Sequence, residues 1–128
     1  MALTTTYMTN PVKTVIVNQT ASTSNSGAGD NNVAGGPVYI VQATLNNTQY
    51  GTAVYTKFYN ATSATAGTDT ATMILYGKAS TSHTYVFHPP IFFSNGISMV
   101  TTTTAGQAGT TAPSTPPAVT LVLSESAS

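Results

Sequence analysis

The chain has 128 residues, of which only three are lysines and three are acidic, with no arginine and no cysteine. Soluble domains carry about 25% charged residues, so this chain has little with which to build an acid–base pair, a phosphate clamp or a metal site. The net charge is zero and the lysines are isolated, which argues against a nucleic-acid partner.

The N-terminal half is expected to contain three strands. Residues 12–18 place apolar side chains on both faces of an expected strand, whereas residues 19–37 are rich in Thr, Ser, Asn, Gly and Ala and predict a loop or flexible segment. Residues 38–45 and 52–59 are both rich in β-forming residues. The polar connector between them, residues 46–51, contains Asn and Gly, which favours a hairpin.

The C-terminal half is expected to contain further short strands, at residues 71–76, 82–88, 97–101 and 119–123. Pro89-Pro90 should prevent the second of these from continuing as a central strand, because proline cannot donate to a sheet ladder. Asn95-Gly96 is the strongest turn dipeptide of the chain. Residues 102–117 form a second Thr-, Gly- and Pro-rich segment that we expect to be flexible.

This pattern predicts an all-β fold in one domain covering residues 1–128. Apolar residues recur at every second position, no window has a helical repeat, and the 26 threonines suit half-exposed sheet. About eight short strands favour a β-sandwich of the jelly-roll type, with a barrel as the alternative. The alternation predicts a core that contains Phe58, Ile74, Leu75, Phe87, Phe93, Ile97, Leu121 and Leu123. Ile74 and Leu75 are adjacent, so at most one of them can face it.

No catalytic, cofactor or metal site is expected. His83 and His88 lie five positions apart on one strand and should point to opposite faces. Asp30, Asp69 and Glu125 are far apart in the sequence. Because no nucleophile elbow, phosphate loop or zinc-protease motif occurs either, we expect a protein that is not an enzyme and carries no cofactor.

The tyrosines form the one group of residues with a functional interpretation, because such rings stack on sugars or anchor protein interfaces. They are also ordinary strand residues. Six of the chain's seven tyrosines belong to this group: Tyr39, Tyr50, Tyr55, Tyr59, Tyr76 and Tyr85. In the strand at 52–59, alternation separates a core face from a face that carries Tyr55, Lys57 and Tyr59. We predict that these three residues form an interface.

Three stretches of the chain, at residues 55–60, 67–70 and 92–98, resemble small virion structural proteins of tailed bacteriophages. Those proteins carry a Tyr-x-Lys-x-Tyr strand, an Ala-rich loop that leads into Gly-Thr-Asp, a hairpin, and a Phe-Ser-x-Gly-Ile segment. The resemblance covers residues 50–124. The chain departs from it at Thr56, where an aliphatic residue is usual, and at Ala71, where a proline is usual.

The resemblance implies a capsid decoration, or cement, protein on the outer surface of a tailed-phage head. Its partners would be the major capsid protein and further copies of itself, in a homotrimer with mostly neutral interfaces. The segments at 20–37 and 102–117 would attach it to the shell. The alternative is a tail-fibre, spike or glycan-binding module that contacts the host surface, with a glycan as partner.

The virion is the expected location, after synthesis in the host cytoplasm. Residues 1–6 have neither a basic nor an apolar region, so no signal peptide is expected. The longest apolar runs are far shorter than the ~20 residues of a membrane span, and we therefore expect no membrane partner.

Overall fold

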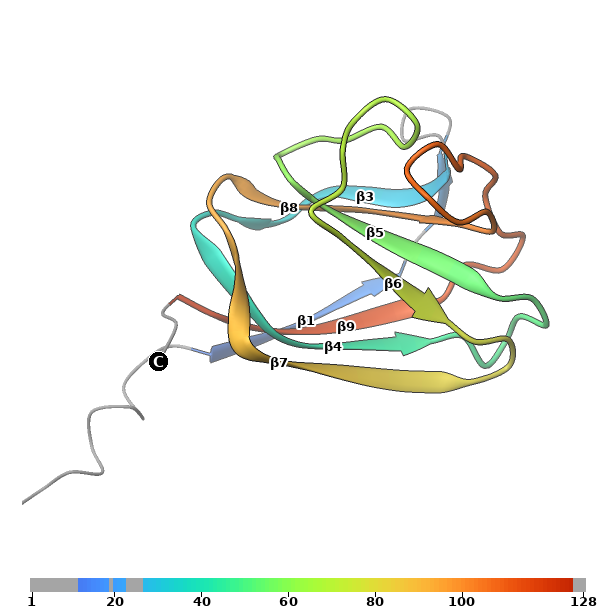
Figure 1. Cartoon of the computed structure of the whole chain (residues 1–128). Coiled ribbons are helices and arrows are strands. Elements are labelled where there is room, and N and C mark those ends of the chain that lie inside the picture. The colour runs from blue at the N-terminus through green and yellow to red at the C-terminus, as the bar shows by residue number, and fades with distance from the viewer. Residues whose placement is uncertain (1–11, 19, 23–26, 126–128) are drawn as a thin grey trace, which may run out of the picture.

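The computed structural model describes residues 12–18, 20–22 and 27–125 (Figure 1). These residues form strands and no helix, so the predicted all-β class is confirmed. The strands are β1 (Val12–Asn18), β2 (Thr20–Ser22), β3 (Gly27–Gly35), β4 (Val38–Asn46), β5 (Val54–Asn60), β6 (Met73–Gly77), β7 (Ser82–Phe93), β8 (Gly96–Thr102) and β9 (Ala118–Ser124). Among the described residues no helix is long and apolar enough to cross a membrane.

The strands pair into two antiparallel sheets that lie as two layers (Figure 1). The first sheet has the order β1-β9-β4-β7, and the second has the order β2-β3-β8-β5-β6. Strands that follow one another in the chain therefore often belong to different sheets. Most connections consequently cross from one layer to the other at the ends of the strands.

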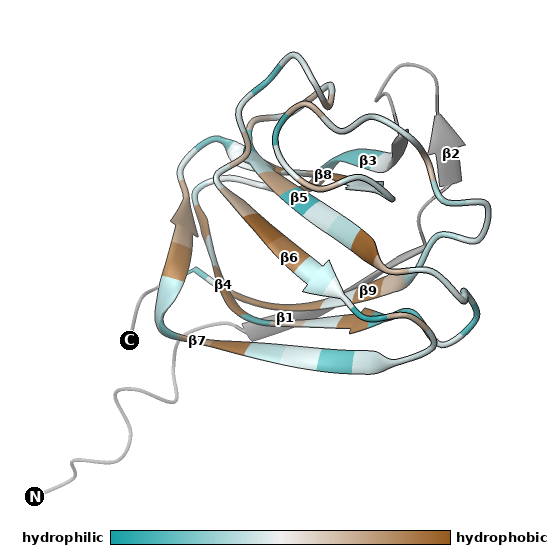
Figure 2. Cartoon of the chain, turned by 45° about the vertical axis from the view of Figure 1, so that its right-hand side comes forward, coloured by the Kyte–Doolittle hydropathy of each residue, from teal (hydrophilic) through white to brown (hydrophobic). Residues whose placement is uncertain are grey.

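The inward faces of the two sheets share one hydrophobic cluster, and Figure 2 shows hydrophobic segments in both layers. β4, β7 and β9 supply it from the first sheet, and β5, β6 and β8 supply it from the second. Its buried members are Val38, Ile40, Ala43, Leu45, Phe58, Leu75, Phe93, Ile97, Met99, Val119, Leu121 and Leu123. Burial of this apolar surface is the main force that holds the layers together.

Most of the predicted core is confirmed. Five of the predicted residues are fully buried: Phe58, Phe93, Ile97, Leu121 and Leu123. Leu75 is also buried, while its neighbour Ile74 is only partly so, as expected for adjacent residues on a strand. The prediction was less accurate for Phe87, which is half-buried because it lies on β7 at the edge of the first sheet.

The hairpin predicted between residues 38–45 and 52–59 is wrong. β4 pairs with β7 and β9, whereas β5 pairs with β6 and β8 in the other sheet. The connector between β4 and β5 crosses between the layers. A polar connector of this length suits a crossing as well as a hairpin, because its residues do not determine which strand pairs with which.

The loop predicted over residues 19–37 is also wrong, because β2 and β3 lie within it. β3 pairs with β2 and β8, and its register with β8 shifts between Asp30 and Ala34. Its Gly-, Asn- and Ala-rich sequence has low strand propensity. Its conformation is therefore determined by hydrogen bonds to the neighbouring strands. These hydrogen bonds cannot be predicted from the local sequence. The expected loop after β8 agrees with the structure, where residues 103–117 contain no strand.

β7 accommodates Pro89-Pro90 because it is an edge strand. It runs from Ser82 to Phe93 and curves from the first layer towards the second (Figure 1). Its register with β4 shifts between Ile40 and Gln42, which leaves residues 87–90 out of the ladder. The expectation that the prolines would prevent a regular central strand is confirmed, since bulges and edges are where sheets tolerate proline.

We expect Phe93→Ala to reduce the free energy of unfolding by about 3–5 kcal/mol, because it leaves a cavity in the shared cluster. Phe92→Ala is the matched control. The Phe92 ring is 46% exposed and packs on Tyr39, so its loss should cost no more than about 1.5 kcal/mol. Urea denaturation of the two variants measures the difference. Equal losses would contradict the placement of Phe93 between the sheets.

Candidate functional site

The outer face of the second sheet is covered by two loops, residues 61–72 and 103–117, which gather over β5 and β8 in Figure 1. Tyr59 and Val100, on the outward side of these strands, form a second buried cluster with Ala64 and Ala66 of the first loop. Hydrogen bonds join the loops to each other. The Gly67 and Ala71 amides donate to Gln107, at its carbonyl oxygen (3.2 Å) and its Oε1 (2.9 Å). This layer removes most of the second sheet's outer face from solvent.

The interface predicted at Tyr55, Lys57 and Tyr59 is therefore wrong for two of its residues. Lys57 is 0% exposed and Tyr59 is 1% exposed, because the loop layer covers them. Tyr55 remains half-buried, with its ring centroid 5.6 Å from that of Tyr76. Strand alternation showed that the three side chains share a face, but it carries no information about loops that fold over that face.

Lys57 has the most unusual environment of any charged residue described. Its Nζ donates to the carbonyl oxygen of Gly109 at 2.6 Å, which ties the second loop to β5. Burial lowers the pKa of Lys57 below its ordinary 10.5. Burial, reinforced by the nearby Asp69, raises the pKa of Tyr59, whose hydroxyl has no hydrogen-bond partner among the described residues. An amine so enclosed cannot reach a substrate, so its role is structural.

The lowered pKa of Lys57 predicts a pH dependence of stability. Towards pH 10.5 the unfolded chain binds this proton more readily than the folded chain, so the free energy of unfolding should rise with pH. We expect this rise between the lowered pKa of folded Lys57 and the ordinary 10.5 of the unfolded chain. Lys57→Met should abolish it. Lys78→Met, at an exposed turn, should leave it in place; chemical denaturation at each pH distinguishes the variants.

The outer face of the first sheet is exposed, and no described loop lies over it in Figure 1. The register brings its residues into rows across β7, β4 and β9, such as Val86, Gln42 and Val122, or Thr84, Thr44 and Thr120. We call it the uncharged face, and its residues are Tyr39, Gln42, Thr44, Asn46, Ser82, Thr84, Val86, Phe92, Ala118, Thr120 and Val122. None of them carries a charge.

The uncharged face combines hydroxyls with exposed apolar side chains. Val86 is 68% exposed and Phe92 is 46% exposed, while the Thr44 and Thr84 hydroxyls hydrogen-bond each other at 2.8 Å. Burying such a surface against a protein partner requires the desolvation of no ionised group, a step that is costly unless the charge gains a partner. Depletion of charge is typical of interface cores.

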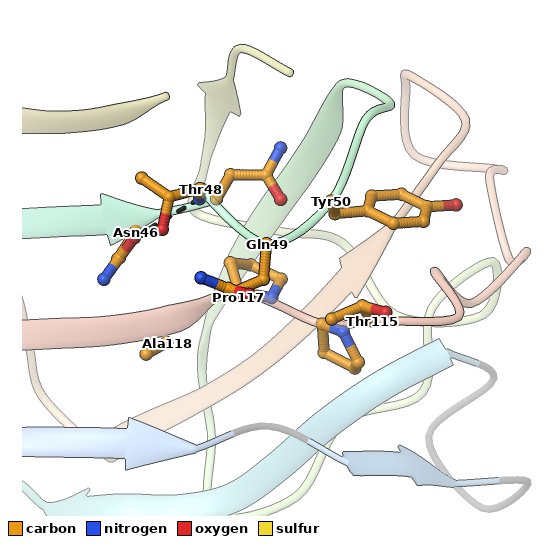
Figure 3. Close-up of a pocket in the computed structure, with 9 residues that line it drawn as sticks. Asn46, Thr48, Gln49, Tyr50, Thr115, Pro117 and Ala118 are labelled. Atoms are coloured by element: carbon orange, nitrogen blue, oxygen red, sulfur yellow. Dashed lines mark hydrogen bonds between the residues drawn. The ribbon is translucent and has the colours of Figure 1, made fainter. Parts of the chain in front are cut away.

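A pocket of about 200 Å³ adjoins one end of this face (Figure 3). The connection after β4 forms one wall, with Asn46, Gln49 and Tyr50, and the segment that leads into β9 forms the other, with Thr115 and Pro117. Asn46 and Ala118 are paired in the register, so the sheet itself brings the two walls together.

The remaining titratable residues do not converge. His83 and His88 are both exposed, and the ring of His83 packs on Tyr85 with centroids 4.6 Å apart. Asp69 accepts a hydrogen bond from the Thr65 amide at 2.7 Å. Burial raises the pKa of Asp30, and its Oδ2 has no partner in the described part of the chain. Within that same part, no three His, Asp or Glu residues come together as metal ligands.

Sequence reasoning missed both the uncharged face and the pocket. A signal for the face was present, because residues 38–46, 82–93 and 118–124 contain no lysine, aspartate or glutamate. The pairing of these three segments in one sheet could not be read locally.

Comparisons of the chain with protein-family models, with curated proteins and with solved structures found no match. Function is therefore inferred from the chain's own residues and geometry.

Proposed function

We propose that the chain is a non-enzymatic virion structural protein, a capsid decoration protein that binds the outer surface of a tailed-phage head. The observation that carries the proposal is the uncharged face of the first sheet, which is open while the opposite outer face is covered by loops. The major capsid protein is the partner we assign to this face. The loop layer would then point away from the shell. This assignment replaces the expected attachment through the segments at 20–37 and 102–117, because β2 and β3 lie within the first and the second lies over β5 and β8 on the opposite face.

A jelly-roll sandwich is the fold that we propose for this role. The orders β1-β9-β4-β7 and β3-β8-β5-β6 support it, because two interleaved Greek keys produce two four-stranded sheets in which chain neighbours alternate between layers. The short β2 is then an addition beside β3. The single cluster between the sheets supports a sandwich over a barrel.

Two of the three stretches that resemble phage virion proteins, residues 55–60 and 92–98, meet in space, which supports the use of the resemblance. Asn60, at the end of β5, donates from Nδ2 to Ser94 Oγ at 3.0 Å. Its Oδ1 accepts a hydrogen bond from the Asn95 amide at 2.7 Å. The Tyr-x-Lys-x-Tyr strand and the Phe-Ser-x-Gly-Ile segment are thus parts of one local structure.

Immunogold labelling tests the proposal directly. Antibodies raised against the purified chain are applied to intact particles from the host that carries its gene. Labelling over the head supports a decoration protein. Labelling of the tail or its tip would favour the alternative, a tail-fibre or spike module, and unlabelled particles would overturn both.

Charge placed on the uncharged face should prevent attachment. We expect Val86→Asp to reduce particle occupancy strongly, because the carboxylate would lose its water on docking without gaining a partner. Thr68→Asp, at an exposed position in the loop layer, is the matched control and should attach like the parent chain. Quantitative sedimentation with particles measures occupancy, and equal binding of both variants would remove this face from the attachment surface.

We further propose that the chain assembles into a closed homotrimer. With six charged residues in the sequence, copies can meet only through hydroxyls, amides and apolar groups. We expect light scattering coupled to size exclusion to give the same trimer mass at low and at high salt, because there are few ion pairs to screen. A monomer at all accessible concentrations, or dissociation by salt, would contradict this.

A further inference from the structure

The pocket beside the uncharged face contains polar side chains that the chain itself does not use. Asn46 Oδ1 accepts hydrogen bonds from the Thr48 amide (3.3 Å) and hydroxyl (2.7 Å), which orients its amide and leaves the NH₂ group as a donor. No hydrogen bond to the described residues engages the side chains of Gln49, Tyr50 or Thr115. The lining of the pocket therefore includes polar side chains that are available to a ligand.

The wall of this pocket is held rigidly by a buried residue. Asn47 is 1% exposed, and its Nδ2 donates to the carbonyl oxygens of Thr52 (3.0 Å) and Lys78 (3.1 Å). Its backbone amide donates to the Thr81 carbonyl at 3.0 Å. Its Oδ1 is buried without a partner in the described part of the chain and is not exposed to a ligand in the pocket. A preorganised wall lowers the entropic cost of ligand binding.

Apolar rings complement these polar groups. In Figure 3, Asn46 and Thr48 lie at one end of the pocket and Tyr50 and Thr115 at the other, with Gln49 and Pro117 between them. The lining of the pocket therefore combines the rings of a tyrosine and two prolines with amides and hydroxyls. Such a combination fits a ligand that alternates C–H faces with hydroxyl groups, because each kind of surface meets its counterpart.

The uncharged lining and the volume of the pocket further restrict the class of ligand that it can bind. None of the nine lining residues is charged, so a phosphate or carboxylate would be buried without a counter-ion. The volume of about 200 Å³ is below the roughly 300–1,000 Å³ of sites that enclose a drug-sized molecule. We propose that this pocket binds a single neutral sugar ring of a glycan, a function that does not depend on whether the chain decorates capsids.

Nuclear magnetic resonance titration of the full chain tests the proposal. The probes are methyl glycosides of glucose, galactose and mannose, with a sialic acid glycoside as the charged comparison. We expect at least one neutral glycoside at millimolar concentration to shift the amide resonances of residues 46–50 and 115–118. The sialic acid glycoside should leave them unchanged.

Matched variants then locate the contact. Tyr50→Ala should weaken binding of the neutral glycoside by roughly tenfold, since it removes the stacking face. Tyr76→Ala, which removes an exposed tyrosine elsewhere on the surface, should bind like the parent chain. If Tyr50→Ala does not fold, Gln49→Ala and Thr115→Val change exposed side chains only and should each weaken binding.

Three results would overturn the proposal. One is that no neutral glycoside shifts these resonances. Another is that the shifts map to the Tyr76 side of the molecule, and the third is that the charged sugar binds as well as the neutral ones.

Discussion

The structure depends first on the packing of the two sheets against each other in a single hydrophobic cluster. Leu121 and Leu123 from one layer meet Phe58 and Met99 from the other, all of them excluded from solvent. Because so many connections cross between the layers, loosening this cluster would also release the loops and the pocket walls that the strand ends position. The rigidity of the candidate sites therefore derives from the core.

Because the chain has few charged residues, the loops outside that core are held by hydrogen bonds more than by ion pairs. Backbone groups and hydroxyls perform the work that ion pairs perform in most surfaces, as in the bond from the Thr103 amide to the Thr111 carbonyl at 2.8 Å. One of the three lysines is itself buried and serves as a loop anchor through Gly109. The result is a molecule in which loops cover the outer face of one sheet, while the residues of the uncharged face on the other sheet remain open.

The sequence predicted features that depend on alternation within one strand and missed those that depend on pairing between distant strands. Leu121 and Leu123 were placed correctly in the core because period-two alternation reports which side of a strand is buried. β3 was missed because its partner β8 lies some seventy residues away, and Gly-rich sequence alone gives no strand signal. Lys57 was assigned to an exposed face because a covering loop leaves no trace in the strand that it covers. The pocket was missed because its walls, residues 46–50 and 115–118, are far apart in the sequence and meet only where β4 pairs with β9.

The prolines of β7 affect how copies of the chain can associate through the edges of their sheets. A sheet that ends in a regular, unpaired strand offers a template on which another chain can add a strand, and repetition of that step leads to fibres. Here the edge strand carries Pro89 and Pro90 within a stretch that has left the ladder, so no continuous row of donors is available to an incoming strand. Copies of the chain are thereby discouraged from pairing through this edge of the first sheet.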